Sequence, residues 1–212
     1  IGFRTAAPIE LSPTTNYLEA GAFVSTGLLA DDPDPDVQFH FAPLTGLNPA
    51  FAHEPQGFML LVNCTRPFSR GHLELASALP TDAPLVTMNY LDDARDAATL
   101  RAGLALGLEI MDKLVAQGVV AERFSPSDDA LRDPDAYLTA MVDGEFHPAG
   151  TCRMGDDEAA VVDSHLRVRG ISGLRVADAS VMPSLPSGNT NLPVIMIAER
   201  LAEIIVAEKA GA

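Results

Sequence analysis

Tryptophan is absent from this chain of 212 residues, cysteine occurs only twice, and basic residues are scarce. Lysine and arginine total 14 against 29 aspartates and glutamates, which gives a formal net charge of −15. Binding to nucleic acid or to anionic lipid needs clustered Lys and Arg, so the composition disfavours both classes of partner. No apolar run reaches the roughly 18 residues that a membrane-spanning helix requires.

The two cysteines, Cys64 and Cys152, are too few for a disulfide scaffold, which predicts a reducing, cytoplasmic compartment. They form no metal-ligand pattern with the five histidines, so no metal is predicted. The segment that begins at Ile1 lacks the apolar stretch of a signal peptide. With 47% apolar and 20% charged residues, the chain is expected to be globular, with one large domain or two small ones.

The first two thirds of the chain favour an α+β fold, in which helices pack against an antiparallel sheet. Apolar or alternating segments separated by short, turn-forming connections indicate strands, and short connections favour antiparallel pairing. The expected strands are residues 19–25, 37–42, 57–65, 72–76 and 85–90.

Two helices are expected after these strands. Apolar residues at three- and four-residue steps predict a long helix over 92–117, with Gly118 at its C-terminal cap. Asp133 as the N-cap and Pro134 at the first helical position predict a second helix over 134–142.

From His147 onward the signals of regular secondary structure become sparse. Short strands are expected at 166–168 and 174–177, and a helix is expected from Pro193 to about residue 209. An ordered chain with this much irregular backbone usually uses it to build a site.

The start of the helix at Pro193 is a candidate binding element. It follows the polar loop Ser187–Asn191, and the free amides and partial positive charge of a helix N-terminus attract anionic or electron-rich groups. Ordinary capping by Asn191 explains the same residues without a ligand. Both interpretations stay open on these residues alone.

His147 is the candidate base. Pro148 favours an extended backbone at His147, and Gly150 with Thr151 permits a tight turn after it. Histidine takes up a proton near neutral pH without special tuning. Since a lone histidine is more often structural than catalytic, the hypothesis requires a second polar group that converges on His147.

Several short blocks of this sequence occur in an order that matches a known family signature. They are His147–Gly155, Val161–Asp163, Gly173–Ser180 and Ser187–Pro193, with Asn16–Phe23 and Pro35–Phe41 upstream. The first four resemble the C-terminal signature of the glucose–methanol–choline (GMC) flavoprotein oxidoreductases, and the upstream pair resembles the substrate domain of that family. Ordered blocks at family spacing are more specific than one short motif, and the resemblance covers nearly the whole chain.

The resemblance implies FAD-dependent oxidation of an alcohol, with a primary alcohol and its aldehyde as the expected pair. It implies that His147 is the general base while hydride passes to flavin N5, and that Asn189 positions the substrate oxygen. It also implies cofactor contacts, the first two near the ribityl chain or pyrophosphate and the other three at the pyrimidine edge: Asp178, Ala179, Thr190, Asn191 and Pro193.

Candidate substrate-pocket residues lie on the strand at 37–42 and beside the base. Alternation places Gln38 and His40 on one face of that strand, and Phe146 precedes His147. Packing of the strand face under a helix explains Gln38 and His40 equally well. By resemblance, residues 1–146 form the substrate-binding domain, and residues 147–212 form the catalytic loop and the C-terminal part of an α/β FAD-binding domain.

One motif of the family is missing, because Gly-x-Gly-x-x-Gly occurs nowhere in residues 1–212. Together with the start at Ile1, this predicts a fragment or one part of a split or nicked enzyme. Such a chain is expected to bind FAD fully, and to act on its small alcohol substrate, only with an N-terminal FAD-binding fragment. Oxidase and dehydrogenase activity both fit the motifs. A lyase acting on a cyanohydrin and a flavin-free accessory chain are the alternatives on the same fold.

Overall fold

The computed structural model describes residues 1–7, 10, 12, 18, 20–29, 32–43, 45, 54 and 57–211. The chain folds into two compact units. Unit 1 comprises Ile1–Ser69 and Asn89–Asp143, and unit 2 comprises Arg70–Met88 and Gly144–Ala212. The chain therefore crosses between the units after Ser69, after Met88 and after Asp143, and each unit contains two separate stretches of sequence.

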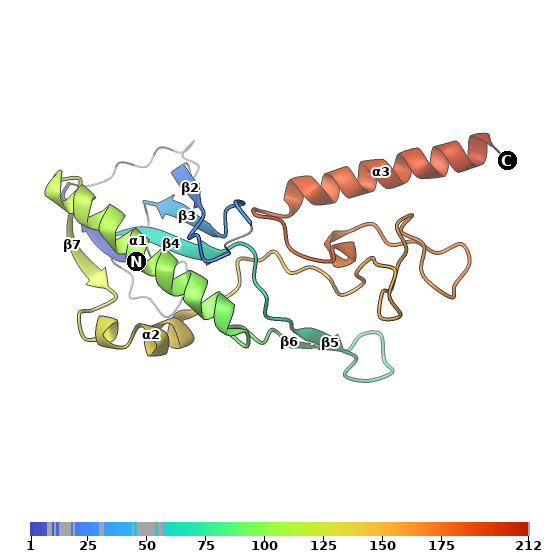
Figure 1. Ribbon diagram of the computed structural model, residues 1–212, viewed down its shortest axis with the longest axis horizontal. Helices are drawn as coiled ribbons and strands as arrows, with labels where there is room; N and C mark the ends of the chain where they lie inside the picture. The colour runs from blue at the N-terminus through green and yellow to red at the C-terminus, as the bar shows by residue number, and fades with distance from the viewer. Residues whose placement is uncertain are drawn as a thin grey trace. The chain divides into compact units, whose positions relative to one another are not determined.

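Unit 1 is built on a five-stranded antiparallel sheet in the order β2-β3-β4-β1-β7 (Figure 1). Its strands are β1 (Gly2–Thr5), β2 (Ala20–Val24), β3 (Val37–Ala42), β4 (Gly57–Cys64) and β7 (Val120–Ser125). In the central register Phe39 pairs with Ala22 of β2 and with Val62 of β4. The expected antiparallel sheet is thus confirmed, and with the helices below it confirms the α+β class.

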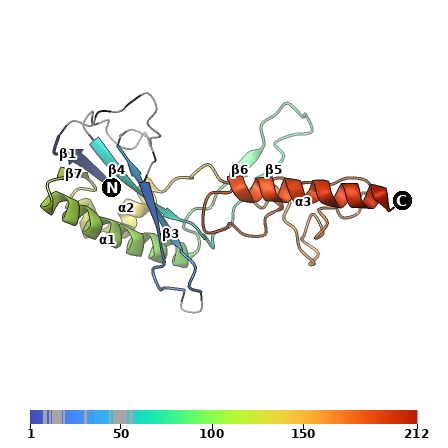
Figure 2. The ribbon, with the colours of Figure 1, turned by 90° about the horizontal axis from the view of Figure 1, so that it is seen from above.

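Helix α1 (Ala94–Ala116) lies along one face of this sheet (Figures 1 and 2). Phe39 of β3 packs with Leu104 and Met111 of α1 in the core of unit 1, and each of the three is at most 5% exposed. The apolar face predicted for the helix at 92–117 is therefore the face that covers the sheet.

Two glycines allow α1 to lie close to the strands. A Cβ added at Gly103 would lie 2.8 Å from Cγ1 of Val62, and one at Gly107 would lie 2.8 Å from Cδ1 of Ile1. Both distances are shorter than real Cβ contacts allow, so a side chain at either position would force the helix or the facing side chain to shift.

The caps of the first two helices lie close to the predicted positions. The C-cap of α1 is Gln117 rather than the predicted Gly118, which follows it with φ of 72°, the left-handed conformation of a glycine that ends a helix. Helix α2 (Pro134–Met141) begins after Asp133, whose carboxylate accepts a hydrogen bond from the amide of Ala136 at 3.0 Å. The short 3₁₀ helix η1 (Ala130–Arg132) precedes it.

Strands β1 and β7 are elements that the sequence patterns do not predict. β1 is four residues long, and its register against β7 shifts between Gly2 and Phe3 and again between Phe3 and Thr5. Strands are recognised in sequence by regular alternation, which these bulges interrupt.

Unit 2 contains little regular structure. It has a two-stranded hairpin of β5 (His72–Glu74) and β6 (Leu85–Thr87), the 3₁₀ turn η2 (Ala179–Val181) and the long helix α3 (Asn191–Ala210) (Figure 1). Ile197 of α3 packs against a small core around Val162, Leu166 and Val181. None of the helices in the described part of the chain is long and apolar enough to cross a membrane.

Some expected boundaries in and beside unit 2 were wrong. The strand expected over 85–90 ends at Thr87, and Asn89 has a positive φ of 53° that breaks the extended backbone. The strands expected at 166–168 and 174–177 amount to isolated bridges, one between Arg167 and Arg175 and one between Val168 and Val162.

The start of the last helix also differs from the expectation. α3 begins at Asn191, two residues before Pro193, and Thr190 is its N-cap. The alternative in which Asn191 caps the helix was therefore wrong.

Candidate active site

The segment that carries His147 runs beside the turn η2. Three amides of residues 150–154 donate hydrogen bonds to three consecutive carbonyls of residues 179–181. The pairs are Gly150 with Ala179 (3.3 Å), Cys152 with Ser180 (2.9 Å) and Met154 with Val181 (2.9 Å). Two of the sequence blocks are thereby joined without regular strands.

Gly150 is required by the turn that follows His147. Its φ is 92°, a conformation that L-residues rarely adopt, and an added Cβ would lie 3.3 Å from the carbonyl oxygen of Met182. The glycine therefore lets the backbone turn tightly after the candidate base.

The imidazole of His147 is held at both ring nitrogens. Its Nδ1 lies 2.9 Å from Oγ1 of Thr190, and its Nε2 lies 2.7 Å from Nδ2 of Asn189. Asn189 and Thr190 are consecutive residues, 42 and 43 positions from the histidine. The polar groups that the base hypothesis requires therefore converge on His147.

The chemistry of the two partners determines which nitrogen carries the proton. An amide nitrogen donates hydrogen bonds and does not accept them, so Asn189 donates to Nε2 and Nε2 presents its lone pair. The ring proton then lies on Nδ1 and is donated to the hydroxyl of Thr190. A neutral imidazole held in this way has Nε2 as its basic atom.

The N-terminus of α3 suits an electron-rich group. Thr190 is 5% exposed and its carbonyl accepts from the amide of Val194 at 2.9 Å, which is the first bond of the helix. The side chain of its N-cap residue, Thr190, makes no capping hydrogen bond. The amides of Asn191 and Leu192 therefore lie where a helix binds anionic or electron-rich partners.

Asp178 has a structural contact of its own. Its Oδ1 accepts from the amide of Ser180 at 2.8 Å and from the hydroxyl of the same serine. The Asp178 carboxylate is exposed, whereas Ala179 is half-buried and binds Gly150 through its carbonyl. Asp178 therefore shapes η2, and the cofactor contacts expected of both residues stay predictions.

The pocket candidates belong to different units. Gln38 is 8% exposed and His40 is half-buried, and both lie on β3 of unit 1. Phe146, in unit 2 with His147, is 92% exposed and has a positive φ of 60°. The substrate-pocket role of these three residues stays a prediction.

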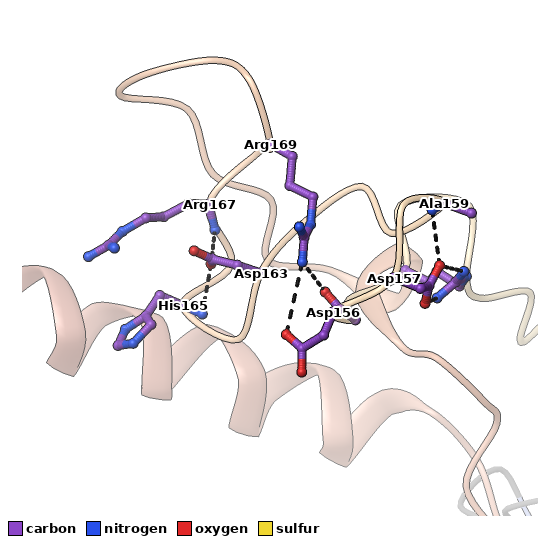
Figure 3. Close-up of polar contacts among 9 residues, drawn as sticks. Asp156, Asp157, Ala159, Asp163, His165, Arg167 and Arg169 are labelled. Carbon is purple, nitrogen blue, oxygen red and sulfur yellow. Dashed lines mark hydrogen bonds and ion pairs between the residues drawn. The ribbon is translucent and has the colours of Figure 1, made fainter.

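The segment after the His147 block is fixed by polar contacts (Figure 3). Oδ1 of Asp163 accepts from the backbone amides of His165 (2.8 Å) and Arg167 (2.9 Å), and the amide of Arg167 is the main cause of the lowered pKa of Asp163. The guanidinium of Arg167 also pairs with Glu208 of α3 at 2.5 Å. These contacts attach the irregular segment to the helix that begins at the site.

Comparison with known proteins identifies the family. Residues 67–198, more than half of the chain, match the C-terminal family model described as GMC oxidoreductase. The chain belongs to the GMC oxidoreductase family. The resemblance inferred from the sequence blocks is thus confirmed.

Curated GMC relatives are similar over nearly the whole chain. An oxygen-dependent choline dehydrogenase from Burkholderia cenocepacia (strain HI2424) is 40% identical over 194 residues, which cover 90% of this chain and 34% of the relative. An alcohol dehydrogenase [acceptor] from Pseudomonas putida is 42% identical over 202 residues, which cover 91% of this chain and 35% of the relative. The chain therefore spans about a third of the length of these relatives.

Solved structures agree with this assignment. Pyridoxine 4-oxidase from Mesorbium loti superposes with a TM-score of 0.85 at 27% identity, over 95% of this chain and 40% of that one. Formate oxidase from Aspergillus oryzae, in a structure that concerns FAD modification, gives a TM-score of 0.73 at 28% identity, over 83% of this chain and 32% of that one. FAD is thus the cofactor named for a structural relative.

One contact of the site was missed by the sequence analysis. The resemblance places Thr190 at the flavin edge, whereas the structure places its hydroxyl on Nδ1 of His147. The only available signal was the position of Thr190 directly after Asn189. No local pattern reports a contact across 43 residues.

Proposed function

We propose that this GMC chain carries out the acid–base part of FAD-dependent oxidation of a primary alcohol to its aldehyde. The observation that carries the proposal is the pair of hydrogen bonds that Asn189 and Thr190 make with the two ring nitrogens of His147. In this arrangement the lone pair of Nε2 can act as a base. The names of the relatives, a choline dehydrogenase and an alcohol dehydrogenase, support an alcohol as the substrate class.

In the proposed reaction His147 removes the hydroxyl proton of the alcohol. The substrate hydroxyl takes the place of the Asn189 amide at Nε2 and donates its proton there. The displaced Asn189 amide then donates to the substrate oxygen, where negative charge develops. A positioned general base of this kind accelerates a reaction by about 10²- to 10⁴-fold.

FAD, when bound, supplies the acceptor for the hydride that leaves the alcohol carbon. The residues proposed to hold it are Asp178, Ala179, Thr190, Asn191 and Pro193. The N-terminus of α3, which the side chain of Thr190 does not cap, supports this assignment, since free amides at a helix start match an electron-rich ring edge. Because the hydroxyl of Thr190 contacts His147, we assign its part in holding FAD to its backbone.

We further propose that an N-terminal FAD-binding part of the same enzyme covers unit 2. Leu192 is 75% exposed, Ile195 50% and Met196 64%, so the first two turns of α3 present apolar side chains to solvent. Exposed apolar clusters usually mark an interface. The missing Gly-x-Gly-x-x-Gly motif and the threefold greater length of the relatives support this partner. A cytoplasmic location is also part of the proposed function.

The test begins with intact-mass and visible-absorbance analysis of the purified protein, followed by anaerobic addition of primary alcohols. We expect two polypeptides, or one longer polypeptide, with a flavin spectrum that bleaches with one of the alcohols. His147→Ala should slow bleaching by about 10²- to 10⁴-fold. The matched control His165→Ala, at an exposed histidine of unit 2, should leave it unchanged.

Two outcomes contradict the proposal. Cleavage of a cyanohydrin without bleaching by any alcohol would favour the lyase. A folded, colourless assembly that never takes up FAD would favour the accessory chain.

A further inference from the structure

Thr190 occupies the N-cap of α3 but does not use its side chain to cap the helix. Ser and Thr at this position usually accept a hydrogen bond from an amide of the first turn. The side chain of Thr190 makes no such bond, and its Oγ1 lies instead 2.9 Å from Nδ1 of His147. At 5% exposure, Thr190 is the most enclosed of the polar residues at the site.

We propose that Thr190 is a positioning residue that determines which nitrogen of His147 is basic. The inference rests on the proposed function, in which Nε2 takes the substrate proton. A hydroxyl can either donate to Nδ1 or accept from it. In the structure the amide nitrogen of Asn189 faces Nε2, so the hydroxyl of Thr190 is the acceptor for the Nδ1 proton, whereas a proton on Nε2 would require the Asn189 amide to rotate and Thr190 to donate instead. The consecutive pair Asn189 and Thr190 therefore selects the form with a proton on Nδ1 and a lone pair on Nε2.

Removal of the Thr190 hydroxyl is expected to move the ring proton of His147. In Thr190→Val a methyl group replaces Oγ1 at nearly the same volume, and a proton on Nδ1 then lacks its acceptor. The ring proton shifts to Nε2, where the side-chain oxygen of Asn189 accepts it after rotation of the amide. Nε2 then presents no lone pair to the substrate. Thr190→Ser restores the hydroxyl and is the matched control.

A loss of folding stability is not expected to affect the comparison of Thr190→Val with Thr190→Ser. The side chain of Thr190 makes no capping bond, so Thr190→Val removes none from α3. Thermal unfolding of the two variants, followed by circular dichroism, should give similar midpoints.

The first measurement reads the proton position without any reaction. In the chain labelled with ¹⁵N-histidine, at a pH where the imidazole is neutral, the two nitrogens of His147 are assigned by comparison with His147→Ala. The wild type and Thr190→Ser should show a protonated Nδ1 and an unprotonated Nε2. Thr190→Val should show the reverse, and an unchanged spectrum in this variant would overturn the inference.

The second measurement separates this inference from the proposed function. In the enzyme assembled with its FAD-binding part, Thr190→Val should lower kcat by about 10²-fold with little change in KM, while Thr190→Ser stays near the wild type. If His147→Ala abolishes oxidation but Thr190→Val alters neither kcat nor the spectrum, the role of Thr190 is wrong and the proposed function stands. If His147→Ala leaves oxidation intact, the proposed function itself is wrong.

Discussion

Cys64, at the end of β4, shows how strongly burial in unit 1 changes the pKa of a side chain. Burial, reinforced by the charge of Asp96, raises the pKa of its thiol to about 12. Because the thiolate is the reactive form, we expect Cys64 to react with N-ethylmaleimide about 10³-fold more slowly than an unfolded cysteine near pH 8. Mass spectrometry of the peptide measures this, with the denatured chain as control. Equal rates in the folded and denatured chains would contradict the raised pKa.

The same thiol makes stability depend on pH. Its folded pKa lies above the unfolded value of 9.0, so the folded state keeps a proton that the unfolded state loses. The stability that this group contributes is present below pH 9.0 and is lost as the pH rises toward 12. We expect the free energy of unfolding to fall over that range, and to fall less steeply in Cys64→Ser. Parallel curves for the two proteins would exclude Cys64 as a cause.

At the scale of elements, Asp96 joins helix α1 to the segment that follows β4. Its carboxylate, 3% exposed, accepts from the amides of Phe68 (2.7 Å) and Ser69 (2.8 Å). Asp96→Ala leaves both amides without this acceptor, so we expect the free energy of unfolding to fall by about 2–4 kcal/mol in urea denaturation. The exposed Asp92→Ala should change it by less than about 0.5 kcal/mol, and similar losses in both variants would contradict the role of Asp96.

The close approach of α1 to the sheet gives a second prediction at this scale. Replacing glycine by alanine inside a helix normally stabilises it by about 0.5–1 kcal/mol. In Gly103→Ala the new methyl would lie 2.8 Å from Val62, and such overlap costs about 1–3 kcal/mol. We therefore expect net destabilisation of about 1 kcal/mol by urea denaturation. A more stable Gly103→Ala would show that the helix shifts away from the sheet without cost.

The helices and the central strands were predictable because their signals are local. Asp133 followed by Pro134 defines the start of α2 within two residues, and alternation over 37–42 defines β3. β7 was not predictable, since it pairs with β1 across about 120 residues and through shifted register. The same distinction holds in the site, where His147 and Asn189 follow from family blocks but the contact with Thr190 depends on tertiary structure.

At the scale of the whole molecule, the two units differ in how well they bury their helices. α1 has six buried residues, including Leu104 and Met111, whereas none of the residues of α3 is buried. We expect amides of α3 to exchange with deuterium at least about tenfold faster than those of α1 in the isolated chain. Mass spectrometry of peptides from both helices measures this. Adding the FAD-binding part should slow exchange in α3, and equal protection of the two helices in the isolated chain would contradict this difference.

The three crossings between the units also constrain protein engineering. A hybrid protein that takes unit 1 from another relative cannot be made with one splice junction, because unit 1 consists of residues 1–69 together with 89–143. Cutting once after Asp143 would leave the hairpin of residues 70–88 attached to the wrong parent. Chimeras of this chain should therefore exchange two inserts at three junctions, so that Arg70–Met88 and Gly144–Ala212 always come from the same parent.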